Sequence, residues 1–91
     1  IDINILSDQF KSKNKNKGIM VVGFVSNNQP FLACSITEDL TSKYDAVSIV
    51  KEGAQLIGGG GGGRKSFAKA GGKNKKNIQA AIIQMKKKVI G

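Results

Sequence analysis

The first apolar residues of the chain recur with the period of an α-helix. Ile3, Leu6 and Phe10 follow one another at spacings of three and four residues, which places their side chains on one stripe of a helix. Asp2 precedes them and is suited to cap the first turn, because its carboxylate can accept a hydrogen bond from a free backbone N–H group. The pattern predicts an amphipathic helix over residues 3–15, which ends in a basic, asparagine-rich segment.

Two short runs rich in valine, isoleucine and phenylalanine come next. Residues 19–26 read IMVVGFVS and residues 31–36 read FLACSI. Both runs are short for a helix, and their β-branched and aromatic residues favour extended backbone. The segment between them, NNQP, consists of residue types that are common in turns. The pattern therefore predicts a β-hairpin with a turn over residues 27–30.

A second helical pattern begins near Asp45, after a polar connection over residues 37–44 that has room for a helical turn. Asp45 is suited to cap this helix at its N-terminus. Gly58 is suited to its C-terminal end, because glycine readily takes the left-handed conformation that commonly follows the last helical turn. The positions at helical spacing are Ala46, Ile49, Val50, Gly53 and Ile57, and Val47, Ala54 and Leu56 widen the apolar face.

The chain after the glycine run predicts one more strand and one more helix. Residues 66–70 are small and partly apolar, and Gly71 and Gly72 turn the chain after them. Asn74 or Asn77 is suited to cap a final helix, whose apolar stripe consists of Ile78, Ala81, Ile82, Met85 and Val89. The predicted fold class is α+β: a small β-sheet, made of the hairpin plus a strand after the Gly loop, covered by about three helices.

Size and composition fit one small globular domain. The chain has 91 residues, of which 40% are hydrophobic and 23% are charged, and no apolar run is long enough to cross a bilayer. We therefore expect a single domain over residues 1–91 and no contact with a membrane. The abrupt start at Ile1 leads us to expect a piece of a longer polypeptide.

The formal net charge of +9 comes entirely from the second part of the chain. Residues 1–52 carry six lysines and six acidic residues, which cancel, whereas residues 53–91 carry nine basic residues and no acidic residue. Such a one-sided excess attracts polyanions and suits nucleic acid. A general bias toward lysine on solvated surfaces is the alternative, but bias alone does not remove acidic residues from one part of the chain. The basic residues are Arg64, Lys65, Lys69, Lys73, Lys75, Lys76, Lys86, Lys87 and Lys88.

Cys34 is the only cysteine, and the chain contains no histidine. A single cysteine cannot form a disulfide within the chain, and a zinc site lacks its usual ligands. Its position inside an apolar run predicts a buried core residue, while a catalytic thiol would need a base that the chain does not offer. We expect a reducing, cytoplasmic location, no metal, no cofactor and no catalytic centre.

The glycine run over residues 58–63 fits neither of the common nucleotide-binding patterns. The phosphate-binding loop of nucleotide hydrolases needs Lys and then Ser or Thr directly after its last glycine, where this chain has Arg64 and Lys65. The dinucleotide-binding pattern needs a strand before the glycines and a helix after them, which reverses the predicted order. A flexible linker is the simplest alternative. The residues that follow are too few to fold alone, so we expect an ordered loop inside the domain.

A glycine loop exposes backbone N–H groups that can converge on an anion, and neighbouring cations add charge to that geometry. We therefore predict a site that meets phosphate or ribose of a nucleic acid. Only five aromatic residues exist and most lie in core patterns, so we expect base stacking to contribute little. The predicted nucleic-acid-binding residues are Gly58, Gly59, Gly60, Gly61, Gly62, Gly63, Arg64, Lys65, Lys69, Lys73, Lys75 and Lys76.

The segment GGGGGGRKSFAKAGG combines a glycine run that ends in Arg with a small-residue stretch that ends in Gly-Gly. In this it resembles the C-terminal domain of alanyl-tRNA synthetases, which belongs to the DHH-associated domain family shared with certain phosphoesterases. The resemblance covers essentially the full chain and includes DLTSKYDA before the second helix and VKEGAQLIGG at its end.

The resemblance implies a domain that binds the outer corner of tRNA and helps bring the activation and editing modules of a synthetase to one tRNA. The implied parent is an ATP-dependent alanine–tRNA ligase, and the implied partners are alanine-accepting tRNA and the remaining domains of that enzyme. The phosphoesterase relatives hold a substrate phosphate with His after the glycines, where Arg64 stands here. Lys65 and Ser66 depart from the Pro and acidic residue that synthetases often have at these positions.

Two other classes of function stay open. A protein-interaction domain or homodimer would use the stripe of Ile82, Met85 and Val89, or an open strand edge, as its contact. The simpler interpretation of that stripe is core packing. A phosphoester hydrolase is disfavoured by the absence of histidine and of a carboxylate cluster.

Overall fold

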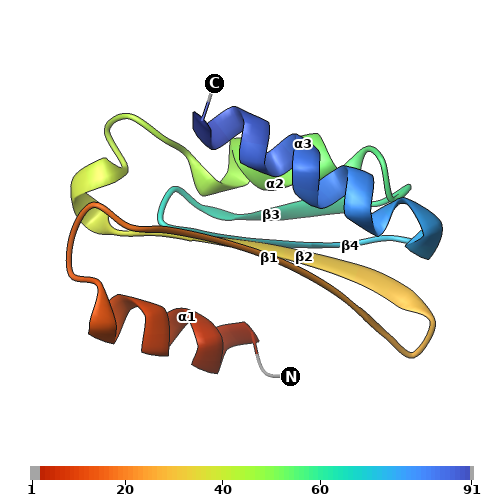
Figure 1. Cartoon of the computed structure of the whole chain (residues 1–91), viewed down its shortest axis with the longest axis horizontal. Coiled ribbons are helices and arrows are strands. Elements are labelled where there is room, and N and C mark those ends of the chain that lie inside the picture. Colours follow the sequence, from red (N-terminus) through yellow and green to blue (C-terminus); the bar gives the residue numbers. More distant parts are fainter. Residues whose placement is uncertain (1–2, 91) are drawn as a thin grey trace.

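The computed structural model describes residues 3–90, which form one sheet with helices on both of its faces (Figure 1). The sheet is antiparallel throughout, with the strand order β1-β2-β4-β3, so that β1 and β3 are its edges. The elements in chain order are α1 (Ile3–Lys13), β1 (Ile19–Ser26), β2 (Gln29–Ile36), the 3-10 helix η1 (Glu38–Leu40), α2 (Ala46–Ala54), β3 (Gly60–Arg64), β4 (Phe67–Gly71), the 3-10 helix η2 (Lys75–Asn77) and α3 (Ile78–Ile90).

Two helices cover one face of the sheet and a third lies on the other. Figure 1 shows α2 and α3 side by side above the strands and α1 below them. The predicted α+β fold is confirmed, and so is the prediction of three main helices on a small sheet. Within residues 3–90 no helix is long and apolar enough to cross a membrane.

The glycine run departs from its prediction, because most of it is a strand and not a loop. Gly60–Arg64 form β3, which pairs antiparallel with β4 at the edge of the sheet. Only Gly58 and Gly59 belong to the connection after α2. Glycine has a low intrinsic preference for strands, so the sequence alone favours a loop here. The register with β4 overrides that preference, and the segment is an ordered part of the domain, as expected.

The hairpin turn is tighter than predicted. The turn residues are Asn27 and Asn28 alone, with φ of 52° and 66°, the left-handed values that a two-residue hairpin turn requires. Strand β2 therefore begins at Gln29, and Pro30 lies buried within it. Strand β4 is likewise shifted by one residue from the predicted 66–70.

Only some of the helix caps that the sequence predicts are present in the structure. Asp45 caps α2, with its side-chain oxygen accepting a hydrogen bond from Val47 N at 2.9 Å. Gly58 has the expected left-handed conformation, with φ of 66°, although regular α2 already ends at Ala54. Asn77 does not cap α3, because its side-chain amide donates to Leu56 O at 2.8 Å. Asn74 precedes η2 without a side-chain cap bond, and the proposed cap Asp2 lies outside the described residues.

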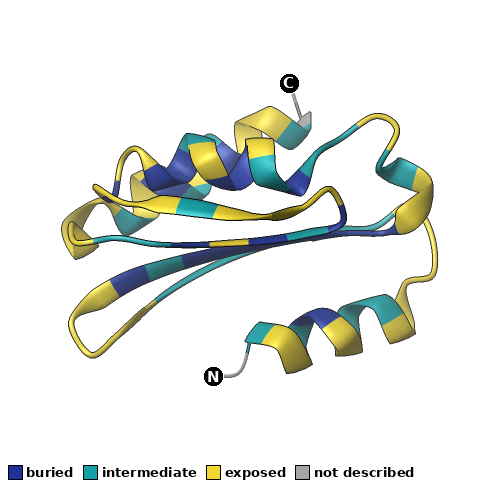
Figure 2. Ribbon diagram, turned by 180° about the vertical axis from the view of Figure 1, so that it is seen from behind, coloured by how far each residue is buried: buried dark blue, intermediate teal, exposed yellow. Residues whose placement is uncertain are grey.

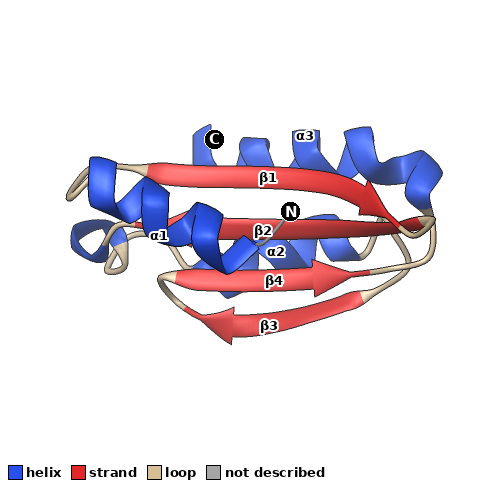
Figure 3. Ribbon diagram, turned by 90° about the horizontal axis from the view of Figure 1, so that it is seen from below, coloured by secondary structure: helices blue, strands red, loops and turns tan. Residues whose placement is uncertain are grey.

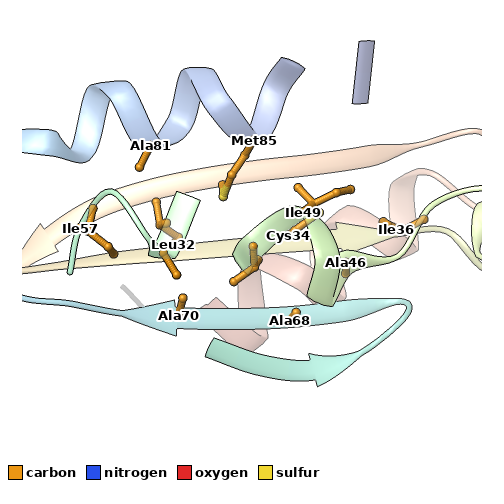
Figure 4. Close-up of a cluster of buried hydrophobic side chains, with 12 residues drawn as sticks. Leu32, Cys34, Ile36, Ala46, Ile49, Ile57, Ala68, Ala70, Ala81 and Met85 are labelled. Carbon is orange, nitrogen blue, oxygen red and sulfur yellow. The ribbon is translucent and has the colours of Figure 1, made fainter. Parts of the chain in front are cut away.

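The core lies between the sheet and the pair α2 and α3 (Figure 4). Leu32, Cys34 and Ile36 point into it from β2, because alternate residues of a strand share one face. Met85 of α3 is fully buried in the same cluster, with Ile82 and Val89 packed against it, so the α3 stripe is core packing. The cluster consists of Leu32, Cys34, Ile36, Ala46, Ile49, Val50, Ala54, Ile57, Ala68, Ala70, Ala81 and Met85.

Cys34 is the buried core residue that the sequence predicts. Its side chain has no exposed surface, and burial raises the pKa of the thiol to about 12. At neutral pH the sulfur is therefore protonated, which makes it a poor nucleophile.

Candidate nucleic-acid interface

The register of β3 against β4 assigns each residue of the glycine strand to a face of the sheet. Ala68 and Ala70 belong to the core, and their partners Gly63 and Gly61 share that face. The remaining positions of the two strands therefore face away from α2 and α3. They are Gly60, Gly62 and Arg64 on β3, and Phe67, Lys69 and Gly71 on β4.

The two sets of glycines differ in their surroundings. A Cβ atom on Gly61 would lie 2.5 Å from the carbonyl oxygen of Lys69, and one on Gly63 would meet the carbonyl oxygen of Phe67. Gly63 also has φ of 150°, which a residue with a side chain rarely adopts. A Cβ on Gly60 or on Gly62 would meet nothing within 4 Å. Glycine is thus a packing requirement at alternate positions and leaves open space at the others.

Backbone hydrogen bonds anchor the β3–β4 hairpin at both of its ends. At the β3–β4 turn, Lys65 O accepts from Ala46 N at 2.9 Å, and Ser66 O accepts from Ile36 N at 2.8 Å. At the opposite end, Ile57 O accepts from Lys73 N at 2.7 Å and from Asn74 N at 2.9 Å. The hairpin is therefore held by the core elements and is no flexible linker.

Strand pairing changes how the glycine backbone can contact an anion. In an extended strand, successive N–H groups point to opposite edges within the plane of the sheet. They do not converge, so the predicted anion-binding nest does not form over Gly60–Arg64. The outward N–H groups instead lie along the free edge of the sheet, about 7 Å apart.

The predicted cations are all exposed and follow the β3–β4 hairpin from end to end. Arg64 and Lys65 lie at its turn, where Glu38, Thr41 and Ser66 line the same depression. Lys69 lies midway along β4, on the face opposite the core. The remaining members, Lys73, Lys75 and Lys76, lie at the far end, in a depression shared with Asn74 and Asn77.

The far end is the more strongly positive one. Its depression is lined by three lysines and two asparagines, whereas Glu38 partly offsets the charge beside Arg64 and Lys65. Lys75 Nζ donates to Asn28 Oδ1 at 2.7 Å, which ties this end to the β1–β2 turn. The structure thus brings the twelve predicted residues onto one hairpin and its flanks but does not gather them around one point.

Sequence reasoning missed the aromatic residues of this face. Phe24, Phe31 and Phe67 do not belong to the core cluster, contrary to the expectation that most aromatic residues lie in the core. They are half-buried on the face that α2 and α3 do not cover. The alternation of residues in β1 and β2 carried this information, because Cys34 in the core places Phe31 on the opposite face.

Exposed residues run along β3, whereas the centres of β2 and β4 are largely buried (Figure 2). Seen from below in Figure 3, α1 crosses β1 and β2 near one end of the sheet and leaves β3 uncovered. Within the part of the chain that the structure describes, no group of three or more His, Cys, Asp or Glu side chains could hold a metal ion.

The sequence model of the DHHA1 domain matches residues 1–91. The chain belongs to the DHHA1 family. This agrees with the resemblance carried by the glycine run and Arg64, and the kinship to the C-terminal domain of alanyl-tRNA synthetases is confirmed by individual relatives.

Alanine–tRNA ligases are prominent among the similar proteins. The chain is 40% identical over 77 residues to that of Desulfosudis oleivorans, which covers 85% of this chain and 9% of the relative. It is 44% identical over 70 residues to that of Dehalococcoides mccartyi, which covers 76% of this chain and 8% of the relative. The chain thus spans about a tenth of the length of the curated relatives it matches.

A solved structure supports the fold independently. The C-Ala domain from Aquifex aeolicus alanyl-tRNA synthetase superposes with a TM-score of 0.80 at 23% sequence identity. The match covers 91% of this chain and 74% of the Aquifex chain. The sheet and its helices are therefore the fold of that domain.

Proposed function

We propose that this chain is a tRNA-binding C-terminal module of an alanyl-tRNA synthetase. It positions alanine-accepting tRNA for the remaining domains of the enzyme in the cytoplasm and so supports aminoacylation and editing. It supplies no cofactor site and no catalytic group. The observation that carries the proposal is the line of exposed cations along the β3–β4 hairpin, in a segment without a single acidic residue.

The contacts expected from this arrangement are electrostatic. Lysine and arginine side chains neutralise phosphates and fix the position of a nucleic acid without reading its sequence. The strongest of these contacts belong to the far end of the hairpin, where Lys73, Lys75 and Lys76 lie together. Arg64 adds a donor fork at the other end that suits a phosphate.

Titration of the chain with alanine-accepting tRNA at increasing salt tests this function. If about four phosphates are neutralised, the logarithm of the association constant falls with the logarithm of salt concentration at a slope of about −3 to −4. Absence of binding at low salt, or an affinity that salt does not change, would contradict the proposal.

Arg64→Ala removes one phosphate contact and should weaken binding to every RNA alike, with a slope smaller in magnitude by about 1. Lys51→Ala is the matched control, because Lys51 is an exposed cation on α2, the helix that covers the opposite face of the sheet from Lys69. Equal losses in the two variants would mean that net charge alone decides the affinity. A dimer that persists in high salt and ignores tRNA would favour a protein-interaction module instead.

A further inference from the structure

The face of the sheet opposite α2 and α3, which α1 covers only in part (Figure 3), carries aromatic rings and bare backbone side by side. Its uncovered part is called the open face below. The register places Phe24 opposite Phe31, Phe31 opposite Gly71, and Gly71 opposite Gly60. The rings of Phe24 and Phe31 lie with centroids 5.5 Å apart and planes inclined by 22°. A Cβ atom on Gly71 would lie 3.4 Å from Phe31 Cε1, so the Phe31 ring borders the partly exposed backbone of β4 at Gly71.

The next row across the sheet adds a cation to this surface. Lys69 pairs with Gly62 and lies on the open face, and its Nζ is 5.8 Å from the ring centroid of Phe67. A Cβ atom added at Gly60 or at Gly62 would have no other atom within 4 Å. From Phe31 to the edge of the sheet, Gly71 and Gly60 therefore add no side chain to this row, and the positive charge of Lys69 lies in the next row.

The occupant of this face follows from charge and shape. Cations lie beside it and at both ends of the hairpin, so an anionic polymer is favoured. Backbone N–H groups of a strand lie in the plane of the sheet, so they cannot hold a phosphate above it. A nucleobase, by contrast, is flat and stacks on aromatic rings while its own phosphates reach the flanking lysines.

We propose that this open face, formed by Phe24, Phe31, Gly60, Gly62, Lys69 and Gly71, is a stacking platform for the flat side of a nucleobase. The proposal rests on the nucleic-acid-binding function proposed above and adds to it a contact that does not depend on phosphates. The base is either an unpaired one or the last pair of a helical stack, since both present the same flat surface.

Two RNA probes separate stacking from charge. One is a single strand of about twelve nucleotides, and the other is an abasic strand with the same number of phosphates. Stacking of one base predicts that the chain binds the base-bearing strand at least about fivefold more tightly in a fluorescence anisotropy titration. A blunt duplex of the same sequence shows whether an unpaired base or a terminal pair is preferred.

Gly62→Val is the decisive variant. Its side chain would rise into open space, so the fold is retained, and β-branched residues favour strands. The uncharged side chain would keep a base from lying flat, and the preference for the base-bearing strand should disappear. Phe31→Leu, which keeps apolar bulk but removes the ring, should reduce the same preference. Ser48→Val, at an exposed position of α2, is the matched control and should leave it unchanged.

The outcomes separate the platform from the proposed function. The platform is supported if Gly62→Val removes the preference for the base-bearing strand and Ser48→Val does not. Equal, salt-dependent binding of both strands overturns the platform and leaves the nucleic-acid function standing. Binding of neither strand, nor of tRNA, overturns both proposals. Equally tight binding of polyglutamate also overturns both, because an acidic peptide has phosphate-like charge but no base.

Discussion

Ser7 of α1 and Ser35 of β2 share a buried hydrogen bond, with their hydroxyl oxygens 2.8 Å apart. Both side chains are almost inaccessible to solvent. The bond ties α1 to the face of the sheet that α2 and α3 do not cover. We expect Ser7→Ala to lower the free energy of unfolding by about 1–2 kcal/mol, because Ser35 loses its buried partner.

The Ser7→Ala, Ser35→Ala double variant is the control for this prediction. When both hydroxyls are absent, neither is left without a partner, so the double variant should lose less stability than the two single variants together. Urea unfolding of the four proteins measures this coupling. Strictly additive losses would show that the two hydroxyls do not depend on each other.

Adjacent glycines of β3 should respond to alanine in opposite directions. Gly61→Ala places a Cβ atom 2.5 Å from the carbonyl oxygen of Lys69, so the strands must move apart, at a cost of about 1–3 kcal/mol. Gly62→Ala meets open space and should be neutral or stabilising by up to about 1 kcal/mol, because the unfolded chain becomes less flexible. Thermal unfolding of the pair tests the assigned faces, and equal effects would mean that the register is wrong.

The sequence predicts the elements of this fold well where side chains report the environment of the backbone. Periodicity gives α2 and α3, and the run IMVVGFVS gives β1 with its ends, Ile19 and Ser26. The prediction fails at β3, because glycines carry no side chains and their sequence cannot show which face of a strand is buried. The information lies in the partner strand, where Ala68 and Ala70 alternate with Phe67 and Lys69.

The sequence predicts which cations belong to the candidate site, but it does not predict how the structure arranges them. Uneven charge identifies the hairpin cations, and the structure leaves them exposed. The aromatic surface needed the arrangement of four strands, because Phe31 and Gly60 are brought into one row only by pairing of both with Gly71. No local pattern in the sequence contains that relation.

The buried thiol of Cys34 should make stability fall at alkaline pH. Burial raises its pKa from 9.0 to about 12, so between these values the unfolded chain releases a proton that the folded chain keeps. The free energy of unfolding therefore decreases as pH rises above about 9, by at most about 1.4 kcal/mol per pH unit from this group. Below that pH the thiol is protonated in both states and contributes no slope.

Cys34→Ala isolates this contribution, because lysines titrate in the same range in both proteins. The difference in unfolding free energy between the native chain and the variant should shrink as pH is raised from 9 to 11. Chemical denaturation at several pH values measures it. A difference that stays constant over this range would show that the thiol ionises equally in both states.

Two clusters of three lysines allow charge to be separated from position. Lys73, Lys75 and Lys76 lie beside the hairpin, whereas Lys86, Lys87 and Lys88 lie on α3, where Lys88 Nζ is 3.8 Å from Glu52 Oε1. Replacing either set by glutamine removes the same charge.

If the hairpin is the interface, only the first triple variant should lower the magnitude of the salt slope for tRNA, by about 2 to 3, because that many phosphate contacts are lost. The α3 triple variant should keep the slope and lose only the weak, long-range attraction that salt screens. Equal salt slopes in the two variants would contradict an interface on the hairpin. A larger decrease of the slope in the α3 variant would place the interface on the opposite face of the sheet.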